Sequence, residues 1–388
     1  EQCPFVEKPS KSVRDYLHEH LKAQDQALES VVAAIESWEF SRSSSKDRTP
    51  LVLAITGPTG TGKTEMSNLL AESLFKRSRK LQHSDKDVAS GLLIFRGEDF
   101  SDNFTNPITA YHTQIKTRLA DHLQHCSGKA VVVFDEVQKV IPHTLDVLME
   151  ALGSRAQLTY YKNGVTKKQD TSNVIFIFVS DIGVEDMERM LIQYPTREDV
   201  PMSSLEVVVK AALDAQWKRL NFGKMIDRVI PFLPFEQAHI AEIIALKLKQ
   251  LDENYRNIYW RELRVEAEIP NYMSLLDSVQ YKVLSAEFDG KVTSSKVFAK
   301  YGARNVDTGP IQQLKSKLLR YLRPFDADAS VSISMDRKTK EISIVSCSAQ
   351  DPSTRSSMTS EDPNQKASPD EDEFTRVACV TKWQGSFQ

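Results

Sequence analysis

The residues best suited to chemistry stand together in one run, Gly57-Pro58-Thr59-Gly60-Thr61-Gly62-Lys63-Thr64. Its glycines let successive backbone N–H groups turn toward a polyphosphate, and a helix that starts there adds partial positive charge. We expect Lys63 to neutralise the β- and γ-phosphates and the Thr64 hydroxyl to ligate Mg²⁺. The alternative is a glycine-rich turn without a ligand, which the strand-then-helix context disfavours.

A carboxylate pair, Asp135 and Glu136, follows the apolar run 131–134. At the end of a strand beside a P-loop, Asp135 is expected to hold Mg²⁺ through its water shell. Glu136 is expected to orient and deprotonate the attacking water. The pair therefore favours hydrolysis over binding alone, and the alternative is a solvated acidic turn after an edge strand.

Short apolar runs separated by helical segments must position these residues. The runs are bounded by polar residues and lie at 51–56, 92–95, 131–134 and 174–179. Such strands predict a parallel sheet covered on both faces, as in an α/β P-loop domain flanked by helices. Later segments return to helical spacing around one hairpin, at 329–333 and 341–345, and predict a small, mainly helical lid domain. We predict a large nucleotide-binding domain over 1–230, the lid over 231–348 and a tail over 349–388.

Composition limits the remaining possibilities. Fifty Lys and Arg against 53 Asp and Glu give a net charge of −3, and without a basic arm we expect no nucleic-acid partner. The longest apolar run, Val174 to Val179, is too short for a transmembrane segment. Residues 349–373 hold seven acidic and two basic residues with almost no large apolar side chain. Such a segment cannot offset its ordering entropy by burial, so we predict a disordered tail.

The order of these motifs resembles that of the Clp-type branch of AAA+ ATPases. The resemblance runs through GPTGTGKT, FDEVQKV, NVIFIFVSDIG and the YGAR of residues 301–304. Within that branch the chain is most similar to the torsins, through MIDRVIPFLPFE at 225–236 and a Cys before the helix that bears Gln24. The resemblance implies an AAA+ fold that binds Mg²⁺ and ATP, hydrolyses ATP and remodels protein clients.

Two further positions acquire roles from the resemblance. The strand-end residue that senses the γ-phosphate is usually Asn, whereas Ser180 is followed here by Asp181. An ionised Asp181 faces a water or a cation, or weakens hydrolysis; the alternative is a helix N-cap. Arg304 occupies the second sensor position, where torsins have Gly-Cys-Lys, and is expected to reach the nucleotide. Its alternative is a surface arginine at the start of a helix.

This chain lacks the arginine that, in Clp unfoldases, inserts into the nucleotide site of the neighbouring subunit. Clp unfoldases carry an arginine at the position of Met225, which Lys224 precedes. Methionine cannot stabilise transition-state charge, and lysine lacks the bidentate fork. Arg228 either substitutes or is a surface residue. We therefore expect a homo-oligomer or a hetero-ring with an activator that supplies the arginine, as for torsins.

The family also raises alternatives for the mode of action. An aromatic pore loop flanked by glycines is missing between the two nucleotide motifs, where Phe100 and Phe104 lie. A Clp-type chaperone that threads substrates is therefore disfavoured. Asp181 and Met225 favour another alternative, a scaffold that is locked on its nucleotide and hydrolyses weakly.

The compartment and the base pocket are inferred from resemblance as well. Torsins are lumenal proteins of the endoplasmic reticulum and nuclear envelope, and Cys3 and Cys126 occupy the places of a torsin cysteine pair. The alternative is four unrelated thiols. Asn103 begins a glycosylation sequon, which carries meaning in that compartment. The adenine ring is expected near Ala23-Gln24. The alternative is that the apolar residues beside them, Leu21 and Ala27, only pack in the core.

Overall fold

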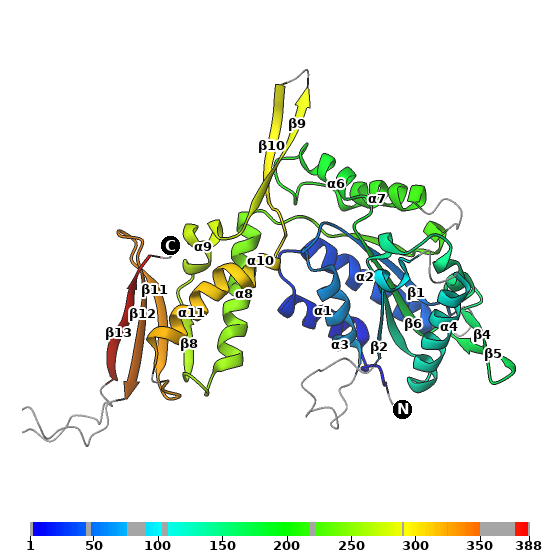
Figure 1. Cartoon of the computed structure of the whole chain (residues 1–388), viewed down its shortest axis with the longest axis horizontal. Coiled ribbons are helices and arrows are strands. Elements are labelled where there is room, and N and C mark those ends of the chain that lie inside the picture. The colour runs from blue at the N-terminus through cyan, green and yellow to red at the C-terminus, as the bar shows by residue number, and fades with distance from the viewer. Residues whose placement is uncertain are drawn as a thin grey trace, which may run out of the picture. The chain divides into compact units, whose positions relative to one another are not determined.

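The computed structural model describes residues 3–43, 48–75, 91–102, 108–216, 222–288, 291–323, 325–349 and 377–386. Two compact units make up the chain (Figure 1). The large unit comprises 1–236 and 281–303, and the small unit comprises 237–280 and 304–388.

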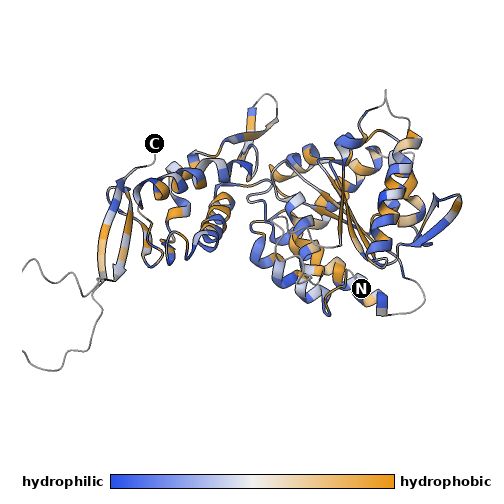
Figure 2. Ribbon diagram, turned by 60° about the horizontal axis from the view of Figure 1, so that its bottom comes forward, coloured by the Kyte–Doolittle hydropathy of each residue, from blue (hydrophilic) through white to orange (hydrophobic). Residues whose placement is uncertain are grey.

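A five-stranded parallel sheet forms the centre of the large unit. Its order is β2-β3-β6-β1-β7, with β1 Leu51–Thr56, β2 Leu92–Arg96, β3 Ala130–Asp135, β6 Val174–Ser180 and β7 Arg228–Pro231. Every residue of β1 and of β6 is buried, because helices cover both faces of a parallel sheet. Figure 2 shows these strands as the apolar interior of the unit. The four apolar runs of the sequence are thus β1, β2, β3 and β6, and the α/β P-loop fold class is confirmed.

Helices sort onto the two faces by the alternation of side chains along each strand. One face of β1, represented by Leu53, packs with α1 (Pro9–His20), α2 (Asp25–Ser43) and α3 (Lys63–Leu74). The other, represented by Val52, packs with α4 (Ile108–His125), α6 (Val184–Leu191) and α7 (Met202–Gln216). The remaining pieces of this unit are α5 (Met149–Leu152) and the hairpin of β4 (Gln157–Lys162) and β5 (Val165–Asp170).

A disulfide joins Cys3 to Cys126, with the two Cα atoms 4.9 Å apart. Both side chains are completely buried in the core that α1, α2 and α3 share with the sheet. The pairing inferred from the torsin resemblance is therefore confirmed.

The expected domain boundary after residue 230 differs from the structure. The segment 231–236 stays with the large unit, where Phe232 donates its backbone N–H to the Thr56 carbonyl at 2.7 Å. The hairpin of β9 (Tyr281–Phe288) and β10 (Lys291–Ala299) also belongs to the large unit. It extends away from the sheet in Figure 1. Its base is held because Phe298 is completely buried in the core of the large unit. Residues 281–303 were assigned to the lid from sequence, and that assignment is wrong.

The small unit combines helices with a second sheet. Its helices are α8 (Gln237–Tyr255), α9 (Met273–Asp277), α10 (Arg304–Val306) and α11 (Gln312–Tyr321). Its sheet has the order β13-β12-β11-β8, with β8 Glu262–Val265, β11 Ser330–Met335, β12 Ile342–Ala349 and β13 Val377–Gly385. β11 and β12 form the hairpin that the sequence predicted.

The end of the chain departs from the predicted disordered tail. Residues 350–376 lie outside the described residues, but 377–385 form β13, which pairs antiparallel with β12. A second disulfide joins Cys347 to Cys379 across these strands, with Cα atoms 4.1 Å apart. All four cysteines are thus paired, so the interpretation as four unrelated thiols is wrong. Within the described ranges, none of the helices combines the length and apolar character needed to cross a bilayer.

Candidate active site

The P-loop connects β1 to α3, as the sequence predicted. Gly60 and Gly62 adopt positive φ angles of 78° and 98°, which glycine tolerates without strain. A Cβ on Gly57 would lie 2.3 Å from the carbonyl oxygen of Phe232, so that position admits only glycine. The Lys63 ammonium donates to the carbonyls of Gly57 at 2.6 Å and Pro58 at 2.8 Å. The loop therefore holds its lysine beside the backbone that would surround a phosphate.

Thr64 and Asp135, the two predicted Mg²⁺ ligands, are brought together. The Thr64 hydroxyl donates to Asp135 Oδ2 at 3.0 Å, and the backbone N–H of Glu136 donates to Asp135 Oδ1 at 3.0 Å. A hydroxyl and a carboxylate are hard oxygen donors of the kind that Mg²⁺ prefers. The donor set fits the ion.

Glu136 sits in an unusual backbone conformation beside a lysine. Its φ angle is 55°, and a Cβ on Gly97 would lie 2.1 Å from its carbonyl oxygen. Its carboxylate accepts from Lys139 Nζ at 2.8 Å, and the same ammonium binds Glu98 at 2.7 Å. The hydrogen bonds that Lys139 donates to Glu136 and Glu98 raise the pKa of Lys139, and Lys139 in turn lowers the pKa of Glu98. Lys139 and Glu98 were not identified from sequence.

Asp181 follows β6 directly, at the same sheet edge as the P-loop. Its side chain is exposed, and Ser180 before it pairs in register with Thr56 of β1. The residue at the N-cap of α6 is Gly183, and the structure records no side-chain cap for this helix. The N-cap alternative for Asp181 is therefore wrong.

The connection between α1 and α2 forms a wall beside the P-loop. Gln24 is 4% exposed, and its side-chain amide donates to the carbonyls of Thr61 at 3.1 Å and Leu233 at 2.8 Å. Its oxygen accepts from the Leu233 N–H at 3.1 Å. Leu21 and Ala27 belong to the core, as the alternative interpretation allowed. Gln24 therefore ties the loop to the segment after β7.

A buried arginine joins the same two segments. Arg197 is 4% exposed and donates to the Pro234 carbonyl at 3.0 Å and to the Ala23 carbonyl. Sequence reasoning missed it, because it lies in a polar stretch between α6 and α7 that gives no sign of burial.

The second sensor motif contacts the P-loop through its backbone. Ala303 donates its N–H to the Gly60 carbonyl at 2.8 Å. Gly302 has a φ of 57°, and a Cβ there would lie 2.4 Å from the same oxygen. Arg304 is the first residue of α10 and belongs to the small unit, and its contact with the nucleotide stays a prediction.

Comparison with known proteins finds similarity to the torsins. The torsin family profile matches residues 2–134, from the first cysteine to the strand before the carboxylate pair. A torsin-like protein of Drosophila melanogaster is 26% identical over 215 residues, which are 53% of this chain and 58% of that protein. A torsin-like protein of Caenorhabditis elegans is 25% identical over 71% of this chain and 69% of its own length. The chain is similar to the torsins.

Two further proteins show similarity beyond the torsins. The negative regulator of genetic competence ClpC/MecB of Bacillus subtilis is 25% identical over 76% of this chain and 32% of its own length. The solved structure of the S. cerevisiae Hsp104-ADP complex aligns with a TM-score of 0.58 and 18% identity. The alignment covers 86% of this chain and 52% of that one, and at this identity it shows the fold alone.

The remaining predicted features of the torsin-like chain fall into three groups. Met225 is half-buried against the core of the large unit, whereas Lys224 and Arg228 are exposed. Phe100 is 1% exposed and packs edge-on against Tyr111, with ring centroids 5.3 Å apart. It is a core residue and not part of a pore loop. Phe104 and the sequon at 103–105 lie outside the described residues.

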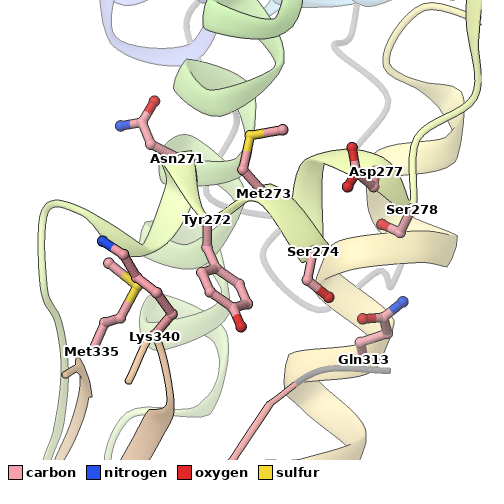
Figure 3. A pocket seen from close by; sticks show the side chains of 9 residues that line it. All are labelled: Asn271, Tyr272, Met273, Ser274, Asp277, Ser278, Gln313, Met335 and Lys340. Carbon is pink, nitrogen blue, oxygen red and sulfur yellow. The ribbon is translucent and has the colours of Figure 1, made fainter. Parts of the chain in front are cut away.

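A separate pocket of about 690 Å³ lies within the small unit (Figure 3). Met273 and Met335 contribute apolar surface, Asp277 and Lys340 contribute opposite charges, and Gln313 projects from α11. None of the residues predicted from sequence to do chemistry lines it. The candidate active site is therefore the P-loop edge of the large unit.

Proposed function

We propose that this chain binds Mg²⁺ and ATP at Gly57–Thr64 and hydrolyses ATP to remodel proteins or their complexes. The observation that carries the proposal is the hydrogen bond between Thr64 and Asp135 at 3.0 Å. It joins the P-loop to the end of β3, and this supports a role for the neighbouring Glu136 at the phosphates. The Hsp104 structure is a complex with ADP, which supports a nucleotide in this fold.

Each residue has a distinct task in this proposal. Bound Mg²⁺ supplies charge neutralisation to the β- and γ-phosphates, and Thr64 and Asp135 would hold it. Lys63 exchanges its two carbonyl acceptors for phosphate oxygens, so its charge is delivered where negative charge gathers. Glu136 orients a water and takes its proton, and Lys139 holds that carboxylate. Asp181 and Arg304 are proposed to report the state of the γ-phosphate.

A partner is needed for full turnover in this proposal. Met225 is packed against the core and cannot present a positive group to a neighbour. An arginine delivered in trans contributes about 10³ to 10⁵ in rate to phosphoryl transfer. We therefore propose that the chain assembles with copies of itself or with an activator that carries the arginine, and that alone it turns ATP over slowly.

The proposed compartment is the lumen of the endoplasmic reticulum and nuclear envelope. Two disulfides, Cys3–Cys126 and Cys347–Cys379, support an oxidising environment. The torsin resemblance supports the same location.

A second candidate is a nucleotide-locked scaffold that binds ATP and hydrolyses little. Asp181 favours it, because an exposed carboxylate stands where an amide is usual and would repel the γ-phosphate. Substrate threading by a Clp-type unfoldase is disfavoured because Phe100 is committed to the core.

The test measures ATP binding by calorimetry and ATP turnover by phosphate release for three proteins: wild type, Lys63→Ala and Glu136→Gln. We expect Lys63→Ala to lose most ATP affinity, and Glu136→Gln to keep affinity but lose turnover about 100-fold or more. Unchanged binding in Lys63→Ala would refute the P-loop assignment. Equal, very slow turnover of wild type and Glu136→Gln, with or without lumenal partners, would establish the scaffold instead.

A further inference from the structure

Lys139 stands between two carboxylates that belong to different segments of the chain. Its ammonium donates to Glu136 Oε2 at 2.8 Å and to Glu98 Oε1 at 2.7 Å. Glu136 is the proposed base, whereas Glu98 lies outside the nucleotide motifs of the sequence. Glu98 is therefore a charged neighbour of the site to which the proposed function gives no role.

The backbone fixes the place of Glu98 relative to Glu136. Glu98 lies in a short helical turn, Gly97–Phe100, that directly follows β2, and a second turn, Val137–Lys139, comes shortly after β3. β2 and β3 are parallel neighbours in the sheet. A Cβ on Gly97 would lie 2.1 Å from the Glu136 carbonyl oxygen, so the two segments touch through their main chains. The points from which the two carboxylates extend are therefore set by the sheet.

An exposed lysine needs more than one acceptor to stay in place. The Lys139 side chain is 40% exposed, and a lysine carries its charge on a flexible four-carbon stem. A single exposed ion pair gains little once the side-chain entropy is lost, whereas a network of several charges gains more. The hydrogen bonds to Glu136 and Glu98 together raise the pKa of Lys139, so the ammonium keeps its charge. Glu98 thus extends an ion pair into a network of three charges.

The network acts on one oxygen of the proposed base. Lys139 binds Oε2 of Glu136, and we assign the other oxygen, Oε1, to the attacking water. A carboxylate that is bound at one oxygen by a fixed donor keeps its plane, and catalysis depends on such orientation. Loss of Glu98 would leave Lys139 bonded to Glu136 but free to move with it. The carboxylate would then lose its orientation while its chemistry stays the same.

We infer that Glu98 is a positioning residue for Glu136 and acts through Lys139. The inference rests on the proposed function, since it adds a residue to the same hydrolytic site. The effect of Glu98 should fall on the rate of hydrolysis and not on nucleotide binding, because the proposed contacts with the phosphates and Mg²⁺ come from Lys63 and Thr64. Glu98 therefore matters to turnover only while Lys139 is present.

The test is a double-mutant cycle on the full chain, with Glu98→Gln, Lys139→Met and the combination of both. Single-turnover phosphate release from Mg-ATP gives the rate of hydrolysis, and calorimetry gives the affinity for Mg-ADP. Glutamine keeps the shape of the side chain without its charge, so we expect Glu98→Gln to lower the rate about threefold. In the Lys139→Met background the same change should have no effect, because the residue through which it acts is gone. The affinity for ADP should stay within about twofold in all three variants.

Asp121 and Lys162 provide a matched ion pair elsewhere in the large unit. Lys162 Nζ donates to Asp121 Oδ1 at 2.6 Å, and the two side chains are 37% and 49% exposed, close to those of Lys139 and Glu136. Asp121→Asn should leave both the rate and the affinity for ADP unchanged. Glu98→Asp keeps the charge at a shorter reach and should retain more of the rate than Glu98→Gln. Because Glu98 is 65% exposed, its variants should keep the melting temperature of the wild type.

Three results would overturn the inference. An equal loss of rate from Glu98→Gln in both backgrounds would show that Glu98 acts without Lys139. An unchanged or a higher rate would show that Glu98 contributes nothing or competes with Glu136 for the ammonium. A parallel loss of affinity for ADP would show that Glu98 supports the phosphate loop as a whole.

Failure of the proposed function gives a different result. Wild-type protein whose hydrolysis equals that of Glu136→Gln would refute the hydrolytic role of Glu136, and with it the inference that depends on that role. Wild-type hydrolysis well above that of Glu136→Gln, together with equal losses in both backgrounds, would refute the role of Glu98 alone.

Discussion

Release of β13 from the small unit is expected when the Cys347–Cys379 disulfide is removed. The two cysteines face each other across β12 and β13, and Cys379 is exposed. Their separation is 32 residues, for which the chain-entropy model assigns about 3.7 kcal/mol at 25 °C. Docking of β13 should therefore weaken by roughly 500-fold in a Cys347→Ser/Cys379→Ser variant.

Hydrogen–deuterium exchange of residues 377–385 measures this directly. In the native chain Trp383 stacks on Tyr321 with ring centroids 6.0 Å apart, and the Lys317 ammonium lies 4.0 Å from the Trp383 ring centroid. Those contacts and the pairing with β12 should protect β13 in the wild type, whereas the double variant should exchange it far faster.

The other disulfide provides the matched control. Cys3 and Cys126 are completely buried and 123 residues apart, for which the same model gives about 4.9 kcal/mol. Their removal should lower the melting temperature of the large unit and leave exchange of β13 unchanged. A mild dithiol reductant should open the exposed pair first. Undiminished protection of 377–385 in the Cys347→Ser/Cys379→Ser variant would refute the reasoning, because side-chain and backbone contacts alone would then hold the strand.

Three further outcomes are expected. Gly302→Ala should lower ATP affinity about tenfold, since its Cβ would lie 2.4 Å from the Gly60 carbonyl oxygen; calorimetry tests this, and wild-type affinity would contradict it. Lys139→Met should reduce turnover about tenfold, less than Glu136→Gln, because it removes an orienting partner and not the base; phosphate release with unchanged rate would argue against that role. Gln24→Ala should destabilise the large unit by about 2–4 kcal/mol in urea unfolding, because it leaves buried backbone groups unpaired; a loss below about 0.5 kcal/mol would show that the wall relaxes.

The sequence predicts the central sheet well because buried strands appear in it as runs of apolar residues. β1, β3 and β6 are almost uninterrupted apolar runs, and parallel strands covered on both faces need nothing else. β5 carries no such trace, since Val165–Asp170 is mostly polar and exposed and depends on its hairpin partner. β13 is not predicted from the sequence for a related reason. It follows a polar, acidic segment, and it forms a strand by pairing with β12.

Within the site, local motifs are predictable and long-range contacts are not. The P-loop and the Asp135–Glu136 pair can be recognised in the sequence because their chemistry requires residues that are adjacent in the chain. Arg197 binds carbonyls that lie 174 and 37 residues away, and no local pattern encodes that. The domain boundary is missed for the same reason, since Phe298 joins a core whose other members come from much earlier in the chain.

The bond between the Ala303 amide and the Gly60 carbonyl uses main-chain atoms only. The side chain of residue 303 can therefore change while this bond is kept, whereas any side chain at position 302 would collide with the Gly60 carbonyl oxygen. The motif thus contains one position, 302, at which the backbone geometry requires glycine, and one position, 303, at which the side chain can vary. In the torsin motif that this chain resembles, a cysteine stands at this position, whereas residue 303 here is alanine. The bond to Gly60 is thus independent of whether residue 303 carries a thiol.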